Sequence, residues 1–263
     1  MRSTPRDSAP SKDEGTPVTM PAPAPLPGRI VRLEPLAYQH VPGLATAAEA
    51  LGDPTGFTLV PHGIDEARTY VDKAQAAWAA GKALAFAIVA HSHNTVGAAG
   101  GVVGATRFVQ LDYWQGPLTW PLPSEPVPPA PDAVPDAVEI GNTWLTPAAR
   151  GGLVNLESKL LLLQHAFDTW GVQRVTLRAD ARNARSRAAI ERLGAVSDGV
   201  LRAHSRGFDG AVRDTAFYSI LRDEWPRVRS TILDQLAARQ ALSMPRTVHH
   251  EPWRTLTSSA ELV

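Results

Sequence analysis

The chain has 263 residues, with 26 Lys and Arg side chains against 26 Asp and Glu, so its formal net charge is zero. This balance argues against a nucleic-acid-binding protein, whose surface is usually strongly basic, and we expect no nucleic-acid partner. Cysteine is absent, which excludes disulfides, a thiolate nucleophile and a cysteine-ligated metal.

The two ends of the chain differ in composition from its middle. Residues 1–27 are rich in Pro, Ser, Thr and Ala, and residues 243–263 lack helical periodicity, so we expect two flexible tails. Residues 28–242 are long enough for a single domain with a well-buried core. There is no signal-peptide pattern and no window near the ~18 apolar residues of a membrane span, which predicts a cytoplasmic protein without membrane partners.

The first part of this domain is predicted to contain three strands and two helices. Hydrophobic periodicity places strands over 29–33, 84–90 and 96–111 and helices over 39–50 and 64–80. Residues 116–137 form a Pro-rich run that cannot be a central strand or helix. We expect this run to be an extended insertion at the surface.

The chain is organised around residues 138–163, VEIGNTWLTPAARGGLVNLESKLLLL. They predict a short strand, a turn with two glycines and a strongly apolar helix over 153–170. The free N–H groups in the first turn of a helix, together with the helix dipole, attract negative charge. The stretch therefore predicts an anion site in front of the helix.

The remaining residues predict a strand, a helix, two strands and a closing helix, over 173–179, 184–193, 196–202, 211–221 and 223–240. Asn183 is a good N-cap for the first of these helices, and Gly194 follows its end. This order of elements predicts a mixed α/β fold, in which helix crossovers join the middle strands and hairpins flank them.

Several separated motifs occur in an order that resembles a known family. They are EIGNTWL, ARGGLVNLESKLLLL, VTLRADARNARSRAAIERLGA, VRDTAFYSI and DEWP. The chain resembles the GNAT (GCN5-related N-acetyltransferase) superfamily, and most of all its ribosomal-protein alanine acetyltransferase-like branch (RimJ/RimL type). The resemblance implies a central mixed sheet with splayed middle strands and flanking helices. It also implies acetyl-CoA as co-substrate, direct transfer of the acetyl group to an amine, no metal, and a monomer or homodimer.

The resemblance also implies which residues hold acetyl-CoA. Residues 138–145 and 175–179 are the splayed strands beside the pantetheine arm, and 150–155 form the pyrophosphate loop. The implied cofactor-binding residues are Asn142, Thr143, Trp144, Leu145, Arg150, Gly151, Gly152, Leu153, Val154, Asn155, Asn183 and Ser186. Leu153 and Asn155 stand where the family usually has Gly or Ala. Leu153 can still donate its backbone N–H if its φ is negative, whereas a left-handed conformation costs roughly 1 kcal/mol.

Glu139 is the candidate general base, because transfer to an amine needs that amine neutral. A surface carboxylate without a catalytic role is the alternative for Glu139. In many GNAT enzymes a Tyr protonates the departing thiolate, but Ile190 stands at that position, so the acid is elsewhere or is not needed. A backbone N–H near Asn142–Trp144 is expected to polarise the acetyl carbonyl.

Other assignments remain open at this level. Asn183 can be an N-cap alone, and Arg150 can be a solvated turn residue. His204 is a candidate for the acceptor site, whereas His165 is expected to pack within its helix. The acceptor is either a small molecule or a protein N-terminus. A non-catalytic CoA-binding or interaction module, or an enzyme that uses a larger acyl-CoA, are the alternative functions.

Overall fold

The computed structural model describes residues 23–51, 57–91, 101–114, 116, 120, 129–130 and 132–243. Residues 1–22 and 244–263, which make up most of the two expected tails, lie outside the described residues. So do residues 92–100, at the start of the strand expected over 96–111, and much of the Pro-rich insertion expected over 116–137. Within the described part, no helix is long and apolar enough to cross a membrane.

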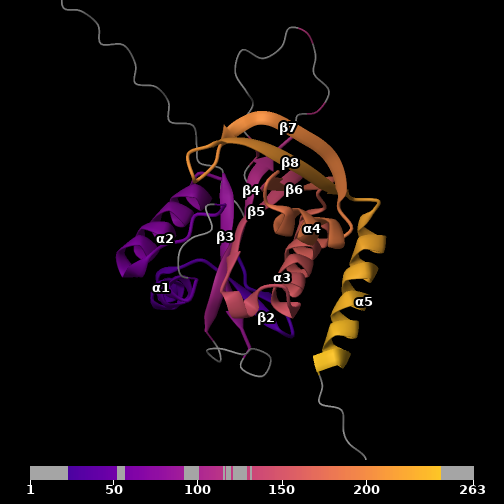
Figure 1. Ribbon diagram of the computed structural model, residues 1–263. Helices are drawn as coiled ribbons and strands as arrows, with labels where there is room; N and C mark the ends of the chain where they lie inside the picture. The colour runs from indigo at the N-terminus through magenta and orange to yellow at the C-terminus, as the bar shows by residue number, and fades with distance from the viewer. Residues whose placement is uncertain are drawn as a thin grey trace, which may run out of the picture.

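A mixed sheet of eight strands forms the centre of the molecule, in the order β1-β2-β3-β4-β5-β6-β8-β7 (Figure 1). Neighbouring strands are antiparallel except β5 and β6, which are parallel. The strands are β1 (Leu26–Pro27), β2 (Val31–Pro35), β3 (Ala83–Ala90), β4 (Val102–Asp112), β5 (Ala137–Leu145), β6 (Arg174–Asp180), β7 (Val196–Arg206) and β8 (Val212–Leu221). The expected mixed α/β fold is confirmed.

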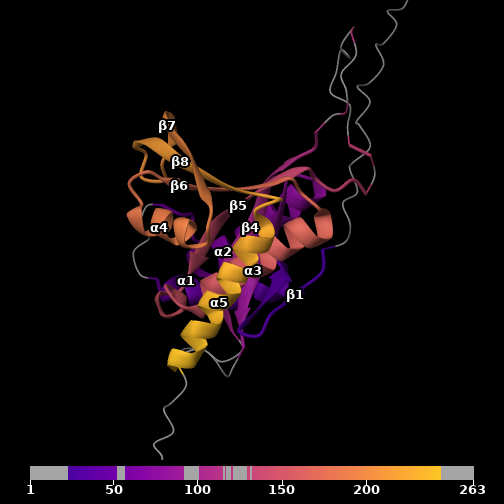
Figure 2. The same cartoon turned by 90° about the vertical axis from the view of Figure 1, so that its right-hand side faces the viewer.

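Helices cover both faces of this sheet. They are η1 (Tyr38–His40), α1 (Val41–Glu49), α2 (Gly63–Ala79), η2 (Pro147–Ala149), α3 (Leu153–Gln164), η3 (His165–Trp170), α4 (Ala184–Arg192) and α5 (Trp225–Ser243). Helices α1 and α2 lie on one face, and α3, α4 and α5 lie on the other (Figure 1). Helix α5 packs beside α3 and covers its outer side (Figure 2).

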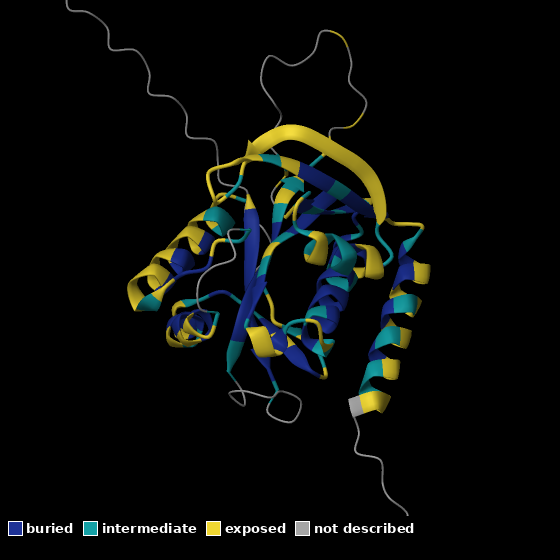
Figure 3. Cartoon of the chain, in the orientation of Figure 1, coloured by how far each residue is buried: buried dark blue, intermediate teal, exposed yellow. Residues whose placement is uncertain are grey.

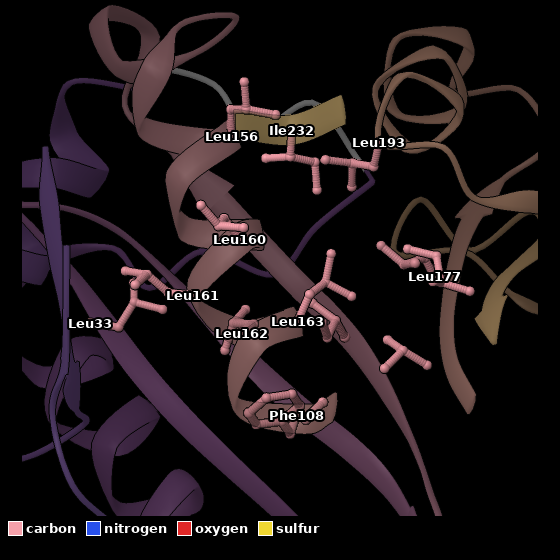
Figure 4. Close-up of a cluster of buried hydrophobic side chains, with 14 of the residues drawn as sticks. Leu33, Phe108, Leu156, Leu160, Leu161, Leu162, Leu163, Leu177, Leu193 and Ile232 are labelled. Atoms are coloured by element: carbon pink, nitrogen blue, oxygen red, sulfur yellow. The ribbon is translucent and has the colours of Figure 1, made fainter. Parts of the chain in front are cut away.

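The larger hydrophobic core lies between the sheet and α3 and α5. Leu160 to Leu163 of α3 are all buried, and Leu33, Phe108 and Leu177 from three different strands pack in the same cluster (Figure 4). The strongly apolar helix expected here is therefore buried on more than one side, as a wide apolar face requires. A second core, under α1 and α2, is rich in alanine and includes Trp144.

A buried carboxylate fastens the start of β2 to α3. Glu157 is 6% exposed. Its Oε1 accepts from the backbone N–H of Arg29 at 2.9 Å, and its Oε2 accepts from those of Ile30 and Val31 at 2.7 Å each. A Cβ at position 28 would come within 2.6 Å of Glu157 Oε2, so glycine is needed there.

Three elements depart from the sequence prediction. Leu26 and Pro27, expected in the N-terminal tail, form β1 and pair with β2. The helix expected over 153–170 is α-helical only to Gln164 and then continues as a π-helix. Strand β7 runs to Arg206, beyond the expected end at 202, and is exposed along its whole length (Figure 3).

Candidate active site

A β-bulge interrupts β5 in the middle of the sheet. In the ladder with β4, Gly141 is opposite Arg107 and Trp144 is opposite Ala105. Asn142 and Thr143 therefore both stand opposite Thr106, and Asn142 has a φ of 49°. Such a bulge leaves one residue outside the regular ladder. It lies at the residues from which a backbone N–H was expected to polarise the acetyl carbonyl.

Strands β5 and β6 part at Glu139. Their parallel pairing runs from Ala137 opposite Arg174 to Glu139 opposite Thr176. It then stops, although β5 continues to Leu145 and β6 to Asp180. A cavity of about 440 Å³ opens at this point, which is within the usual size range of ligand sites.

The cavity collects the residues that the sequence analysis singled out. All the expected site residues line it except Leu153 and Val154. The α4 start contributes Asn183 and Ser186, the 57–60 loop contributes Phe57, and α5 contributes Gln235. The roles of these residues in binding stay predictions, but the structure places them around one cavity.

The charge of the cavity lining is strongly positive. Two carboxylates, Glu139 and Asp180, face six guanidinium groups. We call this set the cavity arginines: Arg150, Arg178, Arg185, Arg192, Arg213 and Arg239. Such an excess of one sign concentrates ligands of the other sign, so the cavity favours an anion.

The glycine turn opens the N-terminus of α3 towards this cavity. Gly151 has a φ of 69°, Gly152 is an extended N-cap, and Leu153 is the first helical residue. Leu153 is not among the described residues with positive φ, so the strain considered for it does not arise. No side chain caps this helix start. Arg239 of α5 donates from Nη1 to the carbonyl oxygen of Gly151 at 3.1 Å and thereby holds the turn.

Arg150 and Asn183 both have structural contacts. Arg150 Nε donates to the carbonyl oxygen of Leu145 at 3.0 Å and ties the end of β5 to the turn. Burial, and then the charge of Arg185, lowers the pKa of Arg150. Asn183 Oδ1 accepts from Ser186 N–H at 3.0 Å, so Asn183 is an N-cap. Both residues also line the cavity, which leaves a second role open.

Glu139 is not a simple surface carboxylate, because it is only 5% exposed. Its Oε1 accepts from Arg178 Nε at 2.8 Å. Burial raises the pKa of Glu139, and the charges of Arg178 and Arg213 only partly oppose this effect. A carboxylate with a raised pKa beside a cavity is a typical general base.

Sequence reasoning missed Lys159. This side chain is 7% exposed and lines the cavity. Its Nζ donates to Thr143 Oγ1 at 2.6 Å and to Thr106 Oγ1 at 3.5 Å, and the two hydroxyls are 2.8 Å apart. Burial lowers its pKa from 10.5 to about 7. The available signal was a lysine directly before the four leucines of a buried helix.

Glu139 and Lys159 approach the bulge from opposite faces of the sheet. Val138 and Ile140 pack in the core under α3, so Glu139, between them, faces the α1 and α2 side. Beyond the bulge Trp144 belongs to the core under α1 and α2, so Thr143 and its partner Lys159 are on the α3 side.

The two histidines considered from the sequence lie outside the cavity lining. His165 packs against Trp170, with ring centroids 4.5 Å apart, as expected. His204 Nδ1 is 3.1 Å from Thr215 Oγ1, and its ring contacts Phe217 edge-on, so the suggested acceptor role finds no support. The described residues contain no group of three His, Cys, Asp or Glu that could hold a metal ion.

Comparison with known proteins identifies the family. The model of the acetyltransferase (GNAT) domain matches residues 31–196. The chain belongs to the GNAT family. The resemblance to the GNAT family seen in the sequence is therefore confirmed. Membership of this family supports acyl-CoA as the donor and N-acyl transfer as the reaction.

Solved GNAT structures match along most of this chain. A putative acetyltransferase from T. thermophilus is 31% identical, with 83% of this chain and 100% of that one covered and a TM-score of 0.61. A GCN5-related N-acetyltransferase from Brucella melitensis is 26% identical, with 85% and 90% covered and a TM-score of 0.65. RimJ from Mycobacterium smegmatis, in complex with CoA-disulfide, shares the fold at 19% identity, with 82% and 94% covered and a TM-score of 0.61. No curated protein is significantly similar.

Proposed function

We propose that this GNAT protein is an acetyl-CoA-dependent N-acetyltransferase that moves the acetyl group directly to an amine, on a small molecule or at a protein N-terminus. One observation carries the proposal. The cavity opens where β5 and β6 part, beside an uncapped helix N-terminus, and its lining is rich in arginine.

The residues of the cavity fit CoA. The α3 N-terminus, preceded by Gly151 and Gly152, offers backbone N–H groups to the pyrophosphate. Charge-assisted hydrogen bonds to the phosphates come from the cavity arginines outside the acceptor face, which are Arg150, Arg185, Arg192 and Arg239. The gap between β5 and β6 is left for the pantetheine arm. A RimL structure in complex with CoA, which has the same fold, supports this placement.

Direct attack is favoured because the described cavity lining holds neither a cysteine nor a hydroxyl paired with a histidine. The chain has no cysteine. The hydroxyls of Thr143 and Ser186 line the cavity, but no histidine lines it among the described residues, so neither hydroxyl has a histidine base beside it. The acetyl group is therefore best transferred in one step.

Glu139 is the base in this proposal. It lies on the face of the sheet opposite α3, whereas the α3 N-terminus binds the cofactor, so the acceptor amine enters from the α1 and α2 side. The raised pKa of Glu139 makes the carboxylate a better proton acceptor. The backbone N–H groups left outside the ladder at Asn142–Thr143 are suited to polarise the thioester carbonyl.

Calorimetry with acetyl-CoA, followed by thiol release over a panel of primary amines, tests the proposal. We expect binding at micromolar acetyl-CoA or below and turnover with at least one amine. Absence of binding would contradict the proposal. Binding without turnover on amines, amino acids and N-terminal peptides would favour a CoA-binding module instead.

A further inference from the structure

Lys159 is a buried amine that the proposed mechanism has not used. It lies on the α3 side of the bulge, and its hydrogen-bond partners are the hydroxyls of Thr106 and Thr143. No carboxylate of the described chain is within ion-pair distance of its Nζ. Burial of an ammonium group beside neutral groups alone costs folding free energy. The stability of the fold therefore does not explain a lysine at this position.

The carboxylates near Lys159 are all turned to other partners. Glu157 of the same helix accepts from the backbone of Ile30 and Val31. Glu139 pairs with Arg178 on the opposite face of the sheet, and Asp180 pairs with Arg182.

The other charged groups around α3 have their own contacts too. On the elements packed against α3, Arg32 and Glu34 of β2 pair with each other, and Arg239 of α5 reaches Gly151. His165 of η3 stacks on Trp170. The cavity arginines share the lining with Lys159, but burial is the cause of its lowered pKa.

We infer that Lys159 is the acid that protonates the departing CoA thiolate, a step that rests on the proposed acetyltransferase function. Two observations place it there. Lys159 lines the cavity on the cofactor side, and it is bonded to Thr143 at the bulge, where the thioester carbonyl is polarised. Ile190, at the position where many GNAT enzymes have a tyrosine, cannot serve as the acid.

The step balances as follows. The acceptor nitrogen bonds to the acetyl carbon and loses its proton to Glu139, and the carbon–sulfur bond breaks with its electron pair on sulfur. The Lys159 ammonium gives its proton to that sulfur, which yields the free thiol. Solvent then carries a proton from Glu139 back to Lys159. An amine with a pKa of about 7 suits both the transfer of a proton to the sulfur and the recovery of a proton from solvent.

A titration of bound CoA tests this assignment without an acceptor. The thiolate is followed by its ultraviolet absorption, in difference spectra against the complex with desulfo-CoA, for the wild type, Lys159→Met, Lys159→Gln and the exposed-site control Lys73→Met. The lysine ammonium stabilises the thiolate. Below about pH 7, where Lys159 is charged and the thiol is mostly protonated, the wild type and the control should show about tenfold more thiolate than either Lys159 variant, equal to one pKa unit.

The outcomes separate the two proposals. CoA binding with equal thiolate fractions in the wild type and Lys159→Met overturns the assignment and leaves the proposed function intact. A thiolate fraction in Lys159→Gln equal to that of the wild type also overturns the assignment, because glutamine keeps a hydrogen bond but has no proton to give. Failure of CoA to bind the wild type overturns both proposals.

A second observation, on the acceptor side, concerns Arg213 of β8. It lines the cavity, yet its side chain has no hydrogen bond or ion pair with any described residue, and its Nε is buried without a partner. Its neighbours are paired, Arg178 with Glu139 and Arg182 with Asp180. The guanidinium group of Arg213, beside the predicted base Glu139, therefore has no carboxylate of the described chain paired with it.

Arg213 faces the acceptor side of the sheet. Ala216 and Tyr218 of the same strand belong to the core under α3, so Arg213, three residues before Ala216, points to the other face. Trp144 supplies a second donor on that side. It lines the cavity, is 4% exposed, and its Nε1 has no partner among the described residues.

We propose that the acceptor amine carries an anionic group that pairs with Arg213, so this second inference also rests on the proposed function. Matched acceptors test it: amino acids against their amides, and aminoalkyl phosphates against the corresponding amino alcohols. The wild type and the exposed-site control Arg229→Gln should favour the anionic member at least about tenfold in kcat/KM. Arg213→Gln should lose that preference.

The two pairs of matched acceptors show whether the anionic group is a carboxylate or a phosphate. Equal use of charged and neutral members overturns this inference, as does turnover confined to neutral amines or a preference that survives in Arg213→Gln. Acetyl-CoA binding, measured separately, reports on the proposed function. A protein that binds acetyl-CoA but acetylates no anionic amine therefore contradicts the Arg213 assignment alone.

Discussion

Glu157 on α3 accepts a hydrogen bond from the backbone N–H of Val31, 126 residues earlier in the chain, at 2.7 Å. The same carboxylate accepts from Ile30 and Arg29. The helix whose N-terminus faces the cavity is therefore tied to the first long strand of the sheet, and the geometry of the site depends on a contact far from it.

Replacement of Glu157 by Leu should destabilise the protein by roughly 3 kcal/mol or more. The variant leaves the buried donors of Ile30 and Val31, and the part-buried donor of Arg29, without an acceptor, and each buried unsatisfied donor costs about 1–3 kcal/mol. Urea unfolding measures the effect. Glutamine keeps one acceptor oxygen and should cost less, so equal stabilities of the Leu and Gln variants would contradict this account.

Glu139→Gln should lower kcat/KM by about 10²-fold if Glu139 is the base. The base must be deprotonated, so activity falls as pH drops through its pKa. Because burial raises that pKa above the ordinary 4.5, the acid limb of the profile should lie at higher pH than for an exposed glutamate. The Gln variant should lose this limb while its acetyl-CoA affinity is kept. An unchanged limb would assign it to another group.

Gly151 in the turn and Leu153 at the start of α3 should respond differently to substitution. Gly151→Ala forces a side chain into a left-handed conformation and should weaken acetyl-CoA binding by about 1 kcal/mol, or fivefold. Leu153→Gly should leave binding unchanged or weaker, because Leu153 already has helical geometry. Isothermal calorimetry compares both with the wild type. Tighter binding by Leu153→Gly would mean that the leucine obstructs the loop.

Arg239→Met should raise the acetyl-CoA dissociation constant about three- to tenfold. The variant removes the hydrogen bond that holds the carbonyl of Gly151, and such bonds contribute roughly 0.5–1.5 kcal/mol. Arg229→Met, an exposed change on the same helix, is the matched control. Equal affinity of both variants would show that α5 does not position the turn.

Lys159→Met should change how stability depends on pH. The folded pKa of Lys159, about 7, is below its unfolded value of 10.5, so the unfolded chain binds more protons between these limits. Stability of the wild type is therefore penalised fully below about pH 7 and recovers as pH rises to about 10.5. The Met variant lacks this penalty and should be more stable by roughly 1–4 kcal/mol at about pH 6. Thermal unfolding across pH measures the difference, which should shrink in alkali.

The fold could be predicted because its signals are local. Alternating residues in β6, the alanine and leucine periodicity of α2 and α3, and the Asn183 cap each depend on near neighbours. The short β1 escaped prediction because two residues carry no periodicity, and its pairing depends on β2. The change from α- to π-helix at His165 likewise has no local sequence signal.

The candidate site was predicted only where a motif marks it. The glycine turn and the residues of β5 stand in recognisable runs, so most of the cavity lining was named. Lys159 and Arg213 were not, because their significance comes from what surrounds them. A lysine is unusual only when no carboxylate reaches it, and an arginine only when its neighbours are paired and it is not.

The bulge at Asn142–Thr143 has a consequence for the order of residues along β5. In a regular strand Glu139 and Thr143, an even number of positions apart, would share a face. The bulge takes up one additional residue, so the predicted base and the hydroxyl that holds Lys159 lie on opposite faces. Deletion of Asn142 would restore a regular ladder with Thr143 alone opposite Thr106, so Thr143 would stay on the α3 side and Trp144 on the side of α1 and α2. The bulge thus adds a residue to β5, and leaves Asn142 and Thr143 together opposite Thr106, without bringing the predicted acid and base to the same face of the sheet.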